Sequence, residues 1–207
     1  PPALIADIAG GAYPATVNIL LALRERDRTG EGAFLDVSMS DNIFPFLYWA
    51  MGAGMVTGEF PGNGDNLVTG GGPRYQLYPT ADGRMVAAAP IEQKFWEAFC
   101  ETIALDPDLR DDTRDPAKTT AAVAKIIAGQ SASYWRETFA VADCCCTIVK
   151  TVDEAMEDPH FKARGLFDHH VTGSDGSEVK ALPTPIAAPL RGDTEKRPYP
   201  GLGAHNK

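Results

Sequence analysis

A glycine-rich stretch divides the chain and constrains its fold more than any other feature. Residues 52–72 contain eight of the 20 glycines of the sequence, at positions 52, 54, 58, 62, 64, 70, 71 and 72. Glycine weakens helices and strands because it loses more backbone freedom on folding than any other residue. Such a composition is typical of a loop or linker, so we place the boundary between two domains here.

The segment before this boundary is mainly helical. From Ile8 to Arg26 apolar residues recur on one side, and a charged run then leads to Gly30, which predicts a helix and its end. Residues 33–39 alternate between apolar and polar and predict a strand. A second helix is predicted over 42–55, and we expect it to be buried because nearly all of its faces are apolar.

After the boundary the pattern changes to short strands and helices, so the chain as a whole belongs to the α/β class. Asp115 before Pro116 is a typical helix start, and Ala81-Asp82-Gly83 is a typical hairpin turn. The predicted elements are a hairpin over 74–90, helices from 91 and over 116–129, 131–140 and 152–157, a strand over 144–149, a hairpin over 167–182 and an extended tail over 183–200.

Composition and charge exclude several kinds of partner. The formal net charge is −9 at pH 7 and no basic run occurs, so we expect neither nucleic acid nor a membrane surface as partner. No apolar run approaches the ~20 residues of a membrane-spanning helix, and we expect a cytoplasmic protein. Cys144, Cys145 and Cys146 are consecutive, which does not suit a disulfide framework or a zinc site, so we expect structural cysteines and no metal ion.

The strongest candidate for chemistry is Asp7. It is a single carboxylate among apolar and small residues, and Gly10 and Gly11 follow it at the start of a helical pattern. An unpaired buried carboxylate is costly, whereas the N–H groups at a helix start favour an anion. A catalytic carboxylate and an ordinary N-cap both fit this pattern.

Glu92, the glycine-rich stretch and two histidines have alternative interpretations. Glu92 falls in the first turn of the helix predicted from residue 91, where an acid can also compensate the helix dipole. The glycine-rich stretch is either a loop over a ligand or a flexible linker. His169 and His170 are neighbours on a predicted strand and point to opposite faces, so we expect surface histidines rather than ligands of one site.

Four segments together resemble family III CoA-transferases of the CaiB/BaiF type, which include the α-methylacyl-CoA racemases. They are PPALIADIAGGAYPA, RTGEGAFLDVSMSDNIF, GGGPRYQLYPTADGRMVAAAPIEQKFW and DPHFKARGLF, in the family's order. The resemblance implies the family's fold, with part of a large α/β domain over 1–68, a small α+β domain over 69–158, and a β-rich return with a proline-rich tail over 159–207. It also implies that an N-terminal half precedes these residues.

The resemblance further implies an enzyme of acyl-CoA thioesters. In the racemase branch, an Asp matching Asp7 and a histidine exchange a proton at C2 of a 2-methylacyl-CoA, and a Glu matching Glu92 partners that histidine. In the transferase branch, the same Asp attacks the thioester and forms a mixed anhydride that a second acid resolves. The short motifs around Asp7 and Glu92 favour the racemase branch. Two features differ from that branch, because Ala9 stands where racemases often have glycine and the catalytic histidine has no counterpart in these residues.

Substrate contacts and partners also follow from the resemblance. We expect contacts to the substrate at Gly10, Gly11, Gly70, Gly71, Gly72 and Tyr75. Coenzyme A is part of the substrate, and no separate cofactor is expected. The family forms interlocked homodimers, so we expect a dimer of the complete protein and no activity from these residues alone. An inactive fragment or dimerisation module is the alternative from another class.

Overall fold

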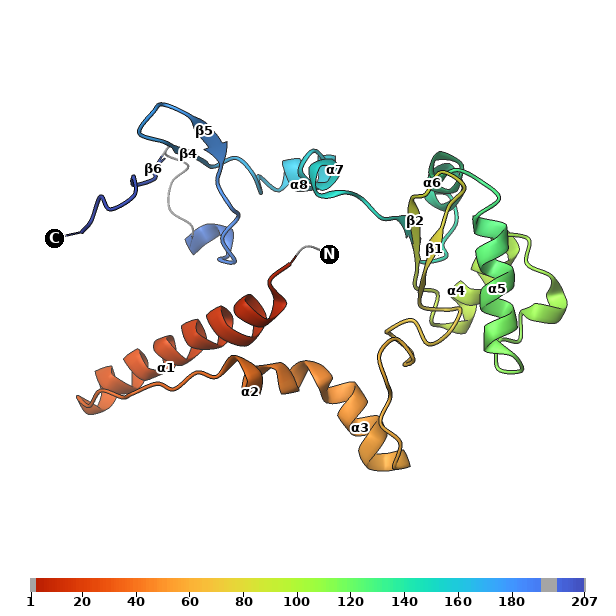
Figure 1. Cartoon of the computed structure of the whole chain (residues 1–207), viewed down its shortest axis with the longest axis horizontal. Helices are drawn as coiled ribbons and strands as arrows, with labels where there is room; N and C mark the ends of the chain where they lie inside the picture. Colours follow the sequence, from red (N-terminus) through yellow and green to blue (C-terminus); the bar gives the residue numbers. More distant parts are fainter. Residues whose placement is uncertain (1–2, 191–196, 207) are drawn as a thin grey trace.

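The computed structural model describes residues 3–190 and 197–206, and it consists of three parts (Figure 1). A helical arm over residues 4–57 lies apart from a compact unit over residues 73–149. A return segment, residues 150–206, leads back from the compact unit toward the side on which the arm lies. The mixed α/β class predicted from the sequence is confirmed, and the core lies in the compact unit.

The arm contains two helical stretches, as predicted. The π-helix η1 (Ala6–Ala12) continues directly into α1 (Tyr13–Thr29), which ends at Gly30 in the left-handed region with φ 81°. The second stretch is broken into α2 (Met39–Ile43), the 3-10 helix η2 (Phe44–Leu47) and α3 (Tyr48–Thr57). Pro45 lies at the start of η2, and its missing N–H explains why a regular α-helix does not run through it.

Two predictions about the arm are wrong. Residues 33–38 form no strand, and Phe34 is 95% exposed. The second helical stretch is not buried either, because Phe46 is 61% and Met55 is 73% exposed. A strand needs a neighbouring strand and an apolar helix needs a covering surface, and the described residues supply neither at these places.

The expectation about long apolar runs is also corrected. Ala6–Thr29 forms one helix of 24 residues with a mean hydropathy of 1.2 in its most apolar window, so it could cross a membrane by length and composition. In the sequence this run is interrupted by Asp7, Pro14 and Asn18. For that reason it was not recognised as one long apolar helix. A single helix of this kind near the N-terminus is weak support for a membrane span.

The compact unit is a three-stranded antiparallel sheet with helices on one face. The strands β1 (Gln76–Pro79), β2 (Met85–Ala88) and β3 (Cys146–Ile148) lie in that order, and Leu77 pairs with Ala87. The predicted hairpin is confirmed, with Gly83 in its turn at φ 76°. The helical elements are α4 (Gln93–Thr102), η3 (Pro107–Leu109), α5 (Pro116–Ile127) and α6 (Ala132–Ala140).

Aromatic side chains form the core of this unit. Phe99 is fully buried, with its ring centroid 5.8 Å from that of Trp96 and 6.2 Å from that of Phe139. Trp135 stacks on Phe139 at 5.3 Å, and its indole N–H donates to the Ile127 carbonyl. The core therefore joins α4, α5 and α6 to the inner face of the sheet.

An ion pair attaches the start of the return segment to the compact unit. Arg84 before β2 donates to both carboxylate oxygens of Glu154, at 3.0 and 2.6 Å, and these bonds lower the pKa of Glu154 to about 2. Glu154 lies in α7 (Val152–Met156), where it also completes a capping box with Thr151. The start of the return segment is thereby held beside the sheet.

The rest of the return segment adds a second small sheet. The predicted helix over 152–157 is present as α7, and Asp158 caps a further helix, α8 (Pro159–Ala163), that was not predicted. The predicted hairpin is present as β4 (His170–Thr172) and β5 (Glu178–Lys180), and β6 (Arg197–Pro198) pairs with β4 in parallel. The 3-10 helix η4 (Ala188–Leu190) precedes β6, and residues 191–196 of the predicted extended tail lie outside the described residues.

We expect Phe99→Ala to destabilise the compact unit by roughly 3–5 kcal/mol, because it removes a fully buried ring and leaves a cavity between two aromatic neighbours. Chemical denaturation of the complete protein, followed by tryptophan fluorescence, measures the change. Val141→Ala is the matched control, since Val141 is 90% exposed in the same unit. Equal unfolding midpoints for the two variants would contradict this account of the core.

Candidate active site

Asp7 lies in the first turn of the arm, within η1. Ile5 occupies the N-cap position, so the interpretation of Asp7 as an ordinary N-cap is wrong. The expectation of burial is also wrong for this chain, because Asp7 is exposed. Turns of π-helix are rare and occur often at functional sites, which agrees with a role in chemistry.

The two glycines after Asp7 have a structural role in the arm. A Cβ atom at Gly10 would lie 2.8 Å from the Met39 carbonyl oxygen and 3.1 Å from the Ile43 side chain. A Cβ atom at Gly11 would lie 3.2 Å from Met39. Gly10 and Gly11 therefore allow α2 to approach η1 closely, and a contact to substrate at these positions stays a prediction.

Glu92 lies directly before α4 rather than in its first turn as predicted, because the helix begins at Gln93 and not at residue 91. It is the N-cap residue with an extended backbone, and its side chain accepts no bond from the helix. Ala89 donates its N–H to the Cys145 carbonyl, which places the exposed Cys145 near this helix start. Burial, and next the charge of Glu92, raise the pKa of the Cys145 thiol. The Glu92 carboxylate is exposed and free of its own helix.

The chain alone does not bring Asp7 and Glu92 together. Asp7 belongs to the helical arm, and Glu92 belongs to the compact unit, which Figure 1 shows as separate bodies. Tyr75 is 38% exposed beside β1 in the compact unit. His169 and His170 are half-buried in the return segment, at the start of β4. The predicted site residues are therefore distributed over different parts of the structure.

The segment before β1 is a folded loop rather than an unstructured linker. The Asn66 carbonyl accepts hydrogen bonds from the N–H groups of Thr69 and Gly71, each at 3.0 Å. A Cβ atom at Gly71 would lie 2.4 Å from the Asp65 carbonyl group, closer than any real contact. We call residues 62–72 the glycine loop, and its shape requires a glycine at position 71.

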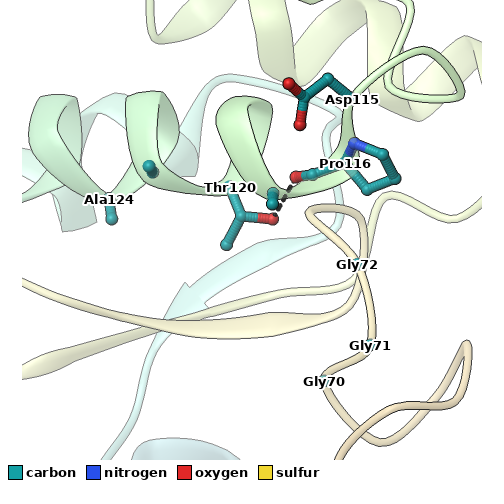
Figure 2. Close-up of a pocket in the computed structure, with 9 residues that line it drawn as sticks. Gly70, Gly71, Gly72, Asp115, Pro116, Thr120 and Ala124 are labelled. Atoms are coloured by element: carbon teal, nitrogen blue, oxygen red, sulfur yellow. Dashed lines mark hydrogen bonds between the residues drawn. The ribbon is translucent and has the colours of Figure 1, made fainter.

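The end of the glycine loop forms one wall of an open cavity of about 570 Å³ (Figure 2). Gly70, Gly71 and Gly72 face the first three turns of α5, which contribute Pro116, Ala117, Thr120, Ala121 and Ala124. Thr120 donates its hydroxyl to the Pro116 carbonyl at 2.8 Å, so its polar group is satisfied within the helix. Asp115, the N-cap residue of α5, also lines the cavity and accepts a hydrogen bond from the Lys118 N–H. The rest of the wall consists of backbone and small side chains, which suit an apolar group.

Arg74 ties the end of the glycine loop to the residue before Glu92. Its guanidinium donates to both carboxylate oxygens of Asp112, at 2.9 and 2.7 Å, and to the Ile91 carbonyl at 3.2 Å. It also lies over the Trp96 ring, 5.0 Å from the centroid. Sequence reasoning missed this pair, because Asp112 is one of several acids in a loop and nothing in its spacing marks it.

Solved structures share this fold. A CaiB/BaiF family protein from Brucella suis is 22% identical and superimposes with a TM-score of 0.71, covering 99% of this chain and 54% of its own. A protein from Mycobacterium tuberculosis, also 22% identical, gives a TM-score of 0.65 over 99% of this chain and 55% of its own. Arm, compact unit and return segment are therefore parts of one known architecture.

The chain belongs to CoA-transferase family III, whose sequence profile matches residues 1–206. It is 31% identical to the α-methylacyl-CoA racemase of Mus musculus over 98% of its length, and 30% identical to that of Homo sapiens over 99%. It is 28% identical to a succinyl-CoA:mesaconate CoA-transferase of Haloarcula hispanica over 97%. The chain spans about half of these relatives, at 53%, 53% and 51% of their lengths.

We expect Gly71→Ala to disrupt the glycine loop, because its methyl group would collide with the Asp65 backbone. Amide hydrogen exchange of peptides covering 62–72 should become about tenfold faster, as local order is lost. Gly72→Ala is the matched control, since a Cβ atom there meets nothing within 4 Å. The loop account fails if both variants exchange at the rate of the unchanged protein.

Proposed function

We propose that the complete protein containing this chain is a cytoplasmic enzyme that interconverts the two C2 epimers of a 2-methylacyl-CoA. The observation that carries this proposal is that two helix starts each have a carboxylate without a bonding partner. Among the described residues, the side chains of Asp7 and Glu92 have no hydrogen-bond or ion-pair partner. Similarity to racemases over 98–99% of this chain supports the assignment.

The proposed reaction removes the proton at C2, returns a proton to the other face, and breaks no other bond. A base takes the C2 proton, and the electron pair of that bond moves toward the thioester oxygen to give a planar enolate. A second group returns a proton to the opposite face. Asp7 is one of these two groups, the other being a histidine expected in the preceding half of the protein, and Glu92 positions that histidine. The enolate oxygen needs N–H donors, which the start of η1 offers beside Asp7.

CoA transfer between carboxylic acids is the second candidate, and the glycine loop favours it. In that reaction, the Asp7 carboxylate adds to the thioester carbonyl, the CoA thiolate leaves, and an acyl anhydride remains for a second acid to resolve. Gly71 donates its N–H to the Asn66 carbonyl, whereas the N–H of Gly72 has no acceptor among the described residues. A free backbone N–H beside the cavity suits a thioester oxygen.

We further propose that the active unit is an interlocked homodimer. The chain exposes 14788 Å² of surface, whereas a compact protein of 22.2 kDa exposes about 9,400 Å². The arm contributes exposed apolar side chains to this surface, among them Leu20 and Leu21 at 61% and 60% exposure. A second copy provides a covering surface and can place its compact unit beside the Asp7 of the first copy.

The proton-transfer reaction is tested by following deuterium at C2 of a 2-methylacyl-CoA in deuterated water, with no acceptor acid and the complete protein. Asp7→Asn should lower the exchange rate by about 10²–10⁴, because it removes one proton-transfer group. Asp27→Asn is the matched control, an exposed acid on the same helical arm. No exchange by the unchanged protein would overturn the racemase assignment, and hydroxylamine trapping of an Asp7 acyl anhydride would then support CoA transfer.

The division of the site between two copies is tested by co-expressing Asp7→Asn and Glu92→Gln chains. If each site takes Asp7 from one copy and Glu92 from the other, half of a random mixture is heterodimer with one intact site. About one quarter of the wild-type activity should then return, while each variant alone is inactive. Activity that stays at the level of the separate variants would place both residues in the same copy or show that only one of them matters.

A further inference from the structure

Gln76 connects the glycine loop to the sheet with both ends of its side-chain amide. Its Nε2 donates to the Gly70 carbonyl at 2.8 Å, and its Oε1 accepts from the Leu77 N–H at 3.0 Å. The Leu77 bond fixes which atom is the oxygen, so the amide must present its N–H group to Gly70. Gln76 is half-buried in β1, which is itself held by the hairpin.

The contact falls at the point where the glycine loop turns toward the cavity. Gly70 has φ +107°, a conformation that few L-residues adopt, so the backbone here needs both a glycine and an external hold. Two residues along β1, the hydroxyl of the buried Tyr78 donates to the Pro73 carbonyl at 2.9 Å. Gln76 and Tyr78 alternate with Leu77, so their side chains share one face of the strand. Together they hold the two ends of the stretch 70–73 whose middle lines the cavity.

We propose that Gln76 is a positioning residue that fixes Gly70–Gly72 against the thioester during the reaction. This proposal rests on the proposed acyl-CoA chemistry and adds the residue that sets the loop's position. Tyr78 and the Arg74–Asp112 pair hold only the Pro73 end of the stretch. Without the Gln76 bond, the hydrogen bonds among the described residues hold the Gly70 end only through Asn66, a residue of the loop itself.

Two variants of Gln76 distinguish the effect of its hydrogen-bond donor from the effect of its side-chain size. Gln76→Met keeps the length of the side chain and removes both hydrogen bonds, whereas Gln76→Glu keeps the acceptor for Leu77 and removes the donor to Gly70. In the complete protein, both should raise amide hydrogen exchange in peptides covering 66–72 by about fivefold to tenfold, with α5 unchanged. Both should lower kcat for deuteration at C2 by about tenfold, with KM changed less than twofold, because the loop is needed at the reacting group.

The matched control is Gln130→Met, at an exposed glutamine in the turn before α6. The inference is overturned if loop exchange stays at the wild-type rate, if it rises while kcat is unchanged, or if Gln76→Glu behaves as the unchanged protein. Equal unfolding midpoints of all variants exclude a general loss of structure as the cause of a lower kcat. If the unchanged protein deuterates no substrate, the proposed racemase reaction has failed, and the hydrogen-exchange result still decides whether Gln76 holds the loop.

Discussion

An exposed helix rich in leucine needs other surfaces around it, and the described residues bury no side chain of α1. None of its residues is buried, although its sequence contains leucine, isoleucine and valine on several faces. The hydrophobic effect therefore favours burial of the arm against something outside it, either another part of the complete protein or another copy. The position of Asp7 depends on that association, because Asp7 lies at the beginning of this same helical arm.

The compact unit, unlike the arm, buries a core of apolar side chains within itself. Its aromatic core is buried within the unit, and Arg74, which follows the glycine loop, donates hydrogen bonds from its guanidinium to Asp112 and to the Ile91 carbonyl. The pair is largely shielded from water, with side-chain exposures of 18% for Arg74 and 13% for Asp112, so both partners depend on each other. The glycine loop and Glu92 are thus carried on a rigid frame, while Asp7 is carried on an arm that needs a partner.

The elements that the sequence predicted well are those with local signals. Asp115 with Pro116 marks the start of α5, and Asp82-Gly83 marks the hairpin turn, because caps and turns depend on a few adjacent residues. The predicted strand at residues 33–39 and the buried second helix failed because both require surfaces that these residues do not provide. Gln76 and the Arg74–Asp112 pair were missed for a related reason, since their partners are fixed only by the folded loop. Asp7 and Glu92 were located by resemblance, and their roles remain predictions.

The proposed chemistry explains why Asp7 and Glu92 should come together only in the assembled protein. An enolate or an acyl anhydride is stabilised by fixed N–H donors in a site from which water is excluded. In this chain Asp7 and Glu92 are both exposed, so solvent would surround a bound thioester at either residue alone. In the proposed homodimer, a compact unit that covers the arm would remove apolar surface from water and enclose Asp7 in one step. Assembly of that dimer would itself exclude water from the site. The folded glycine loop would form one wall of the site, and this wall is already in place before the parts that carry Asp7 and Glu92 meet.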